Sequence, residues 1–253
     1  MEKLYYDLHM HSCLSPCGDN EMTPNNLAGM AALCGMQLIA LTDHNSCRNC
    51  PAALAAGEKL GLLVVPGMEL CTAEEIHVVC LFERLEGALS FGELVKSRSL
   101  HIPNRPDIFG DQLILDGEDN VVGREEELLI SATNIGLTEA PALVRSFGGA
   151  CFPAHVDRDA YSVLSVLGEF PPEADFRAAE YTEQADLPAL LRTHPRLSSM
   201  LLLADSDAHR LESVPEHSGW IALPERSREC LIAALNGAAE CSVGEGETVV
   251  SVL

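Results

Sequence analysis

Apolar runs of strand length alternate with helix-like stretches along most of the chain. Seven of these runs have the length and composition of buried strands, and they lie at residues 3–11, 36–44, 62–70, 76–82, 149–157, 176–183 and 200–209. A helix is expected after the first run, because Thr23 suits an N-cap, Pro24 suits the first turn and Gly35 suits the end. Strands that are apolar throughout are typical of parallel sheets with helices on both faces. The pattern therefore predicts an α/β fold around a parallel sheet.

Residues 99–123 interrupt this alternation with prolines, glycines and acidic residues. We expect an insertion after the fourth strand, with a small hairpin, that serves either as a lid over a site or as a passive excursion. The last residues, 247–253, form either an edge strand or a docked tail. Residues 1–253 are expected to form a single domain, since this length suits one α/β barrel.

The composition is that of a globular protein, because 47% of the residues are apolar. The net charge of −22 argues against extended nucleic acid as a partner and leaves small anionic substrates open. No apolar run approaches the roughly 20 residues that cross a bilayer, and the first residues lack the apolar core of a signal peptide. We therefore expect a cytoplasmic protein with no membrane partner. The sequence indicates no oligomeric state.

Ten cysteines are present, and without an export signal they are expected to be reduced. Cys13 and Cys17 follow the first strand, while Cys47 and Cys50 follow the second. The two pairs either build a metal–thiolate or redox site from both loops, or they are small buried thiols that only fill space.

Polar side chains gather at the ends of the predicted strands. His9 and His11 share one face of the first strand, because side chains alternate along an extended chain. Two imidazoles alone are either a metal site or ordinary exposed side chains. The other strand ends contribute Asp43, His44, Glu69, His77, His155, Asp207 and His209. If these residues meet at one face of a parallel barrel, divalent metal ions would compensate their burial.

These motifs together resemble one known family. The segments "HMH", "TDH", "PGMEL", "IHVVCLF", "PAHVDR" and "SDAH", spread from Leu4 to Arg210, resemble the polymerase and histidinol phosphatase (PHP) family of metal-dependent phosphoesterases. The resemblance implies a distorted seven-stranded (β/α) barrel with two or three divalent ions of manganese, iron or zinc. It also implies hydrolysis of a small phosphomonoester or nucleotide by a metal-activated hydroxide that attacks phosphorus. The expected partner is thus a small phosphorylated substrate, and extended nucleic acid is not expected.

The resemblance also implies a distribution of ligands and three catalytic residues, Glu69, Asp207 and His209. The first metal would take His9, His11, Glu69 and Asp207, and the second would share Glu69 and add His77 and His155. The third would take His44, His209 and a residue of the loop "SCLSPCGDNEMTP", where many family members have histidine. This loop has no histidine, so Asp19 is expected to be the ligand, with a turn-forming aspartate as the alternative.

Neighbouring residues are candidates for supporting roles. Arg158 and Arg210 are expected to contact a phosphate, or else to be ordinary surface arginines. Three carboxylates beside candidate ligands could support them: Asp7, Asp43 and Asp205. Glu180 is either another supporting group or a solvated glutamate. The remaining histidines fit no cluster, namely His101, His194 and His217.

Two other functions remain open at this point. An amidohydrolase barrel also begins with two histidines, but it often bridges its metals with a carboxylated lysine. None of the lysines, Lys3, Lys59 and Lys96, falls at a suitable strand end. A non-catalytic metal- or nucleotide-sensing module is the other alternative, and a competent residue at every ligand position favours an enzyme over it.

Overall fold

The computed structural model of the chain describes residues 1–182, 184–216, 219–246 and 248–252. His217 lies outside the described residues, as do residue 183 of the sixth predicted strand and residues 247 and 253 of the tail. Within the described ranges, no helix is long and apolar enough to cross a membrane.

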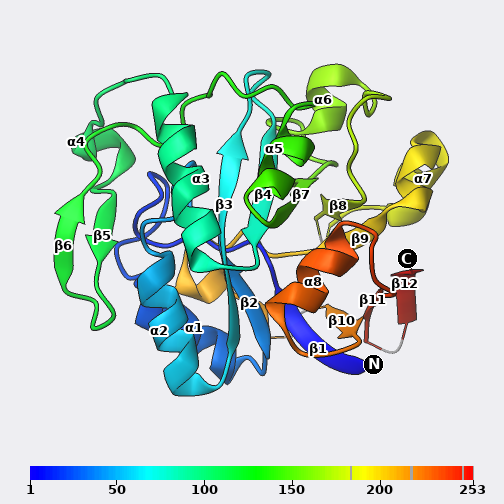
Figure 1. Cartoon of the computed structure of the whole chain (residues 1–253), viewed down its shortest axis with the longest axis horizontal. Coiled ribbons are helices and arrows are strands. Elements are labelled where there is room, and N and C mark those ends of the chain that lie inside the picture. Colours follow the sequence, from blue (N-terminus) through cyan, green and yellow to red (C-terminus); the bar gives the residue numbers. More distant parts are fainter. Residues whose placement is uncertain (183, 217–218, 247, 253) are drawn as a thin grey trace.

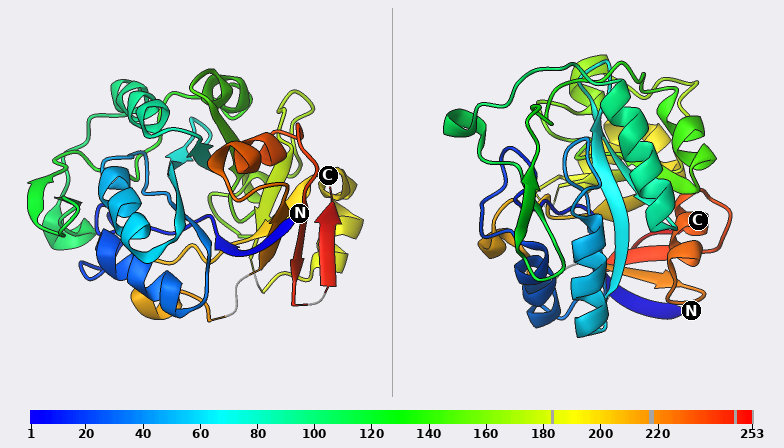
Figure 2. Two further views of the ribbon diagram at one scale, coloured as in Figure 1. Left: turned by 60° about the horizontal axis from the view of Figure 1, so that its bottom comes forward. Right: turned by 60° about the vertical axis from the view of Figure 1, so that its left-hand side comes forward.

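A curled sheet of eight strands organises the molecule (Figures 1 and 2). Its order is β12-β11-β10-β1-β2-β3-β4-β7, and a separate parallel pair, β8 and β9, lies beyond β7. The bounds are β1 Glu2–Asp7, β2 Leu38–Leu41, β3 Leu63–Cys71, β4 His77–Phe82, β7 Gly149–Pro153, β8 Ala178–Tyr181, β9 Leu201–Ala204, β10 Trp220–Leu223, β11 Ser242–Glu245 and β12 Thr248–Val252. All seven predicted strands are present, and the α/β fold is confirmed. The end of the chain is an edge strand, β12.

The sheet departs from the expected parallel arrangement at β4 and along its β10–β12 edge, where β10 is antiparallel to both β1 and β11 and β12 is antiparallel to β11. Strands β1, β2 and β3 are parallel, but β4 runs antiparallel to both β3 and β7. The connection from β3 to β4, residues 72–76, is too short for the crossover that parallel neighbours need. Because β4 is reversed, its first residue His77 pairs with Cys71 and comes to the edge where β3 ends.

Helices and neighbouring strands cover the middle of the sheet, so β2, β3, β4 and β7 are buried on both faces. Their bounds are α1 Pro24–Leu33, α2 Cys50–Leu60, α3 Leu85–Ser97, α4 Pro106–Phe109, α5 Ala140–Ser146, α6 Val163–Leu167, α7 Leu187–Thr193 and α8 Arg228–Leu235, with 3-10 turns η1 Pro195–Ser199 and η2 Leu211–Ser213. As expected, Thr23 caps α1 by accepting from the backbone N–H of Asn26, and Pro24 occupies the first turn. Side chains on one sheet face pack against α1, α2 and α3, while those on the other face pack with β9, β10 and α8. This double burial explains the continuous apolar runs.

The segment 99–123 contains α4 and part of a hairpin made of β5 (Leu113–Leu115) and β6 (Val121–Arg124). Helix α3 lies between β4 and this segment, so the insertion follows a helix rather than the strand itself. The hairpin turn is fixed to the first two helices: Asp119 accepts hydrogen bonds from Thr23 and Asn25, and Lys59 donates to the carbonyl of Gly117. The hairpin therefore braces the start of α1.

Candidate metal centre

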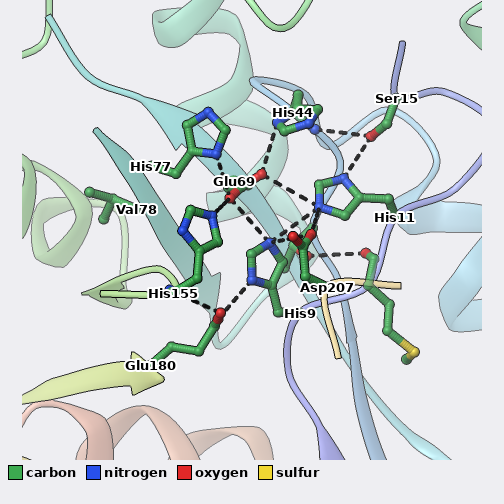
Figure 3. A network of polar contacts seen from close by, with 12 residues as sticks. His9, His11, Ser15, His44, Glu69, His77, Val78, His155, Glu180 and Asp207 are labelled. Carbon is green, nitrogen blue, oxygen red and sulfur yellow. Dashed lines mark hydrogen bonds and ion pairs between the residues drawn. The ribbon is translucent and has the colours of Figure 1, made fainter. Parts of the chain in front are cut away.

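Glu69, on β3, lies at the centre of a cluster of imidazoles at one edge of the sheet (Figure 3). Its side chain is only 1% exposed. Five imidazole nitrogens lie within 3.5 Å of its two carboxylate oxygens: His77 Nδ1 at 2.8 Å, His155 Nε2 at 3.2 Å, His9 Nε2 at 3.3 Å, His44 Nδ1 at 2.8 Å and His11 Nε2 at 3.5 Å. One carboxylate that faces five imidazoles is well placed to bridge two cations.

The backbone brings these side chains together just beyond the ends of the strands. The chain after β1 continues beside the chain after β9, where Met10 pairs with Ala208. In the same way, His44 pairs with Glu69 beyond the end of β2. His155 and Asp207 have positive φ angles, 31° and 51°. Such backbone is strained for residues other than glycine, and strain of this kind gathers at functional sites.

Asp207 and His209 close the cluster on the side of β9. Asp207 Oδ1 lies 3.0 Å from His11 Nε2 and 3.4 Å from His9 Nε2. Its other oxygen accepts a hydrogen bond from Arg158 at 2.5 Å. The His209 ring stacks on the His11 ring, with centroids 4.1 Å apart. The second carboxylate thus faces the same imidazoles as Glu69.

Three overlapping groups have the ligand atoms and spacing to hold a cation. In each group the ligand atoms lie within 4.8 Å of one another: His9, His11, Glu69 and Asp207; His44, Glu69 and His77; and His11, His44 and His209. The first group has the composition expected from the sequence. The second includes His44, whereas the sequence placed His155 beside His77; the third has His11 where a loop residue was expected.

A divalent metal fits this donor set. Several buried polar atoms make no hydrogen bond of acceptable geometry among the described residues, including Glu69 Oε2, Asp207 Oδ1 and His209 Nε2, although imidazole nitrogens lie 2.8 Å from Glu69 Oε2 and 3.0 Å from Asp207 Oδ1. Buried polar atoms without partners are costly and rare in folded proteins. Imidazole and carboxylate are the ligands that manganese, iron and zinc share, so a bound cation would satisfy these atoms.

The charges of the cluster act on one another. Burial by itself would raise the pKa of the Glu69 carboxyl, but His77, His9 and His44 outweigh it and hold that pKa well below its usual range. Burial likewise opposes a high pKa at His77, and the charge of Glu69 still raises it to about 10. In contrast, burial and the neighbouring His209 lower the pKa of His11. The Glu69 carboxyl is therefore ionised, and several imidazoles share its negative charge.

Glu180 supports His9 from behind. His9 Nδ1 lies 2.7 Å from Glu180 Oε2, and the backbone N–H of His155 donates to Glu180 Oε1. Glu180 is buried, which decides against the solvated alternative. A carboxylate behind an imidazole keeps the proton on Nδ1 and directs the lone pair of Nε2 into the cluster.

Ser15 supports His11 in a similar way, although no motif in the sequence points to this residue. The hydroxyl of Ser15 donates to Asp43 at 2.8 Å, so it can accept from His11 Nδ1 at 2.9 Å. Asp43, expected beside His44, therefore acts on His11 through Ser15. It also accepts from both the backbone and the hydroxyl of Ser12.

Asp7 and Asp205 are buried beneath the cluster and hold the backbone. Asp205 accepts from the N–H of Leu8, while Asp7 accepts from the N–H groups of His9 and Ser206. Burial raises the pKa of Asp7 to about 7, although these hydrogen bonds oppose the rise. Both residues thus fix the ends of β1 and β9 where the ligands emerge.

An open pocket of about 660 Å³ leads to the cluster. It is lined by Cys17, His44, Glu69, His77, Ile130, His155, Arg158, Asp159, Ala160, Tyr161, Asp207 and His209. Arg158 is thus placed where a phosphate could reach it. None of the described residues 99–123 lines this pocket, which gives no support to the lid.

Two expected site residues are not brought into the cluster. Asp19 is exposed, and its carboxylate accepts a hydrogen bond from the backbone N–H of Glu21, which is the turn alternative. Arg210 is 67% exposed and lies beside Glu212, outside the pocket lining. His101 is exposed and pairs with Glu127, and His194 caps α7, so neither belongs to the cluster.

The four loop cysteines do not build one site. Cys47 and Cys50 are buried in the core, and both thiols donate to the carbonyl of Gly67. Cys13 is also buried. Cys17 differs from them, because its sulfur lies 3.4 Å from His44 Nε2.

The three lysines lie away from the cluster, so none of them is placed to bridge metals as a carboxylated lysine would. Lys3 lies over the ring of Trp220, and the other two pair with the carboxylates of Glu118 and Glu125. None of them lines the described pocket.

Comparison with known proteins links the chain to nucleases. It is 30% identical over 119 residues to a 5′-3′ exoribonuclease of Haemophilus influenzae. The matched region covers 46% of this chain and 42% of that one. It is 36% identical over 81 residues to the 5′-3′ exoribonuclease Rnm of Salmonella typhimurium, covering 30% and 27%. The chain thus matches less than half the length of these relatives.

The lesion-specific endonuclease PfuEndoQ of Pyrococcus furiosus has a similar fold, with a TM-score of 0.66 and 19% identity, over 96% of this chain and 58% of that one. Endonuclease Q in complex with a 27-mer duplex substrate, carrying an abasic lesion at its active site, matches with a TM-score of 0.64 and 19% identity. This match covers 94% of the present chain and 57% of that one.

These relatives contradict the expected partner. From the sequence we expect a small phosphorylated substrate and not extended nucleic acid, whereas the relatives are exoribonucleases and an endonuclease that holds a duplex. The error came from the net charge of −22, which says little about one site. Charges more than about 10 Å away are largely screened at physiological salt.

The family profile described as the PHP domain matches residues 7–160, which is more than half of the chain. This range contains six of the eight clustered ligand candidates, from His9 to His155. The chain belongs to the PHP domain family.

Proposed function

We propose that this chain is a metal-dependent phosphodiesterase that hydrolyses nucleic acid, with two or three divalent ions of manganese, iron or zinc around Glu69. The observation that carries the proposal is the convergence of five imidazoles on that one buried carboxylate, beside buried atoms without partners. The nuclease relatives support nucleic acid as the substrate class.

The proposed ligands follow the three groups of the cluster. One ion would be held by His9, His11, Glu69 and Asp207; a second by Glu69, His77 and His155; and a third by His44 and His209. Bound ions would supply a Lewis acid for the phosphate oxygens and would lower the pKa of water to near 7.

The chain's own groups orient this centre and neutralise the substrate. Glu180 holds the Nδ1 proton of His9, and Ser15 holds that of His11, so both Nε2 lone pairs point inward. Arg158 is 44% exposed at the pocket wall and uses one N–H for Asp207. Its remaining N–H groups are available to a non-bridging phosphate oxygen.

Tyr161 offers a surface for a base next to the reacting phosphate. Its ring stacks on the His77 ring at a centroid distance of 4.6 Å, lines the pocket and is 44% exposed. Its φ of 55° is unusual for an aromatic residue, so the backbone at this position is strained. Aromatic platforms of this kind bind single-stranded nucleic acid by stacking.

The test is hydrolysis of end-labelled single-stranded RNA, single-stranded DNA and duplex DNA with an abasic site, in the presence of manganese or zinc. We expect cleavage of at least one substrate by the native chain, none after chelation, and none by Glu69→Gln. Arg210→Ala is the matched control and should cleave normally. If no substrate is cleaved although the metal is bound, the nuclease proposal is wrong and the metal-sensing alternative is favoured.

A further inference from the structure

The loop of residues 12–23 places one thiol at the mouth of the metal centre. Cys17 Sγ lies 3.4 Å from His44 Nε2, and Cys17 lines the pocket together with His209. It is the one sulfur atom among the residues that line this pocket in the described part of the chain.

The imidazoles near Cys17 form a group that is short of a ligand. His11, His44 and His209 have ligand nitrogens within 4.8 Å of one another. His209 Nε2 has no hydrogen-bond partner among the described residues. The His44 side chain is only 4% exposed, with its Nδ1 2.8 Å from Glu69 Oε2 and its Nε2 facing Cys17. His11 Nε2 also faces Asp207 and Glu69, so it is shared with the neighbouring group. A cation that prefers four ligands needs a further donor here.

The backbone of the loop fixes the position of Cys17. The N–H of Gly18 donates to the carbonyl of Ser15, and the N–H of Asp19 donates to the carbonyl of His209. A side chain at position 18 would collide with the carbonyl oxygen of Ser12, so this tight turn requires glycine. The turn thereby connects the loop directly to His209 and directs Asp19 outward.

We propose that Cys17 is a thiolate ligand of one cation at this centre, together with His44 and His209; the inference rests on the proposed metal centre. When the cation binds, the S–H bond breaks, the sulfur–metal bond forms and the proton is released to solvent. A thiolate favours zinc, ferrous iron or cobalt over manganese and magnesium. This one site thus differs in metal preference from the two groups built only from imidazole and carboxylate.

Cobalt(II) is the probe, because thiolate ligation gives a near-ultraviolet charge-transfer absorption that nitrogen and oxygen ligands do not give. Chelator-treated full chain is titrated with cobalt, alongside Cys17→Ser, Cys17→His and the control Cys34→Ser, a partly exposed thiol at the end of α1. We expect the band in the native chain and in Cys34→Ser, and its loss in both Cys17 variants.

Competition with a chelator then measures zinc affinity at the same site. We expect Cys17→Ser to bind zinc about 10–100-fold more weakly. Cys17→His should recover most of the affinity without the cobalt band, which also shows that the loop still folds. A band that persists in Cys17→Ser, or cobalt bound to the native chain without a band, overturns the inference and leaves the nuclease proposal intact. If cobalt does not bind at all, the inference is wrong, and the cleavage assay with manganese or zinc decides the nuclease proposal separately. If the band forms but nucleic acid is not cleaved, only the nuclease proposal fails.

Discussion

Two buried glutamates, Glu69 and Glu125, differ in the side chains that neutralise their negative charge. Glu69, 1% exposed, is surrounded by five imidazoles. Glu125, 6% exposed, follows the hairpin of the inserted segment and pairs with Arg48 at 3.1 Å and Lys96 at 3.2 Å. Both carboxyl pKa values lie below their usual range, although burial opposes the fall in each case.

The difference lies in the partners. Arginine and lysine carry fixed positive charges and have no lone pair to offer, so the charge of Glu125 is already neutralised. Imidazoles are weak bases that can bind a metal as well as a proton. Glu125 therefore stabilises the fold, whereas Glu69 lies in the proposed metal centre, where its imidazole partners keep lone pairs for a cation. The predictions below test this contrast, beginning with the largest effect.

Glu69→Gln should abolish function with little change in fold. The neutral amide cannot bridge two cations, so metal affinity should fall, and cleavage of a labelled oligonucleotide should drop at least about 10²–10³-fold, as when a main electrostatic stabiliser is lost. Single-turnover cleavage and calorimetric metal binding measure the two effects. Retention of both at the native level would remove Glu69 from the centre.

Glu180→Ala should weaken metal binding, although Glu180 is not one of the proposed metal ligands. Loss of the acceptor behind His9 Nδ1 leaves that imidazole free to turn or change tautomer, and metal affinity should fall about 10–100-fold. Glu180→Gln retains an acceptor oxygen and should recover part of the loss. Equal affinities in the native chain and Glu180→Ala would show that His9 needs no support.

Arg158→Ala should act on the substrate. The loss of a charge-assisted contact to phosphate, worth about 1.5–3 kcal/mol, predicts a roughly 10–100-fold fall in kcat/KM. Arg210→Ala is the matched control, because this side chain lies outside the pocket lining and should leave kcat/KM unchanged. The same loss in both variants would contradict the placement of Arg158.

Glu125→Gln should lower stability and leave cleavage unchanged. We expect about 1 kcal/mol less free energy of unfolding in urea at pH 7, because one partly buried ionic contact weakens. The folded-state pKa of Glu125 lies below its usual value of 4.5, so its contribution is complete above that value and is lost as the pH falls through the folded-state pKa. The difference between the native chain and the variant should therefore shrink below about pH 4.5. A constant difference across this range would mean that packing, not charge, is responsible.

The strands and the side chains at their ends were predictable from local pattern. Residues 62–70 are recognisable as a strand from their run of leucine and valine, and Glu69 is conspicuous as the one charged residue in that run. The antiparallel direction of β4 was also predictable, because the five residues between β3 and β4, 72–76, are too few for a crossover connection.

The loop residues were not predictable, because tertiary contacts determine their conformation. Asp19 turns outward while Cys17 faces His44, and the hydrogen bond from Asp19 N to the carbonyl of His209 joins parts of the chain far apart in sequence. Ser15 could not be found for the same reason. The substrate was wrongly predicted because a net charge averages over the whole surface, whereas a phosphate meets only the local field.

One experiment tests the central claim most directly, that this cluster binds cations which make it a nuclease. Chelator-treated chain is titrated with manganese, and metal occupancy and hydrolysis of labelled RNA, DNA and abasic duplex are measured in the same samples. The account predicts no cleavage without metal, cleavage that rises with occupancy, and neither in Glu69→Gln. Cleavage at full rate without metal, or manganese bound equally by Glu69→Gln, would contradict it.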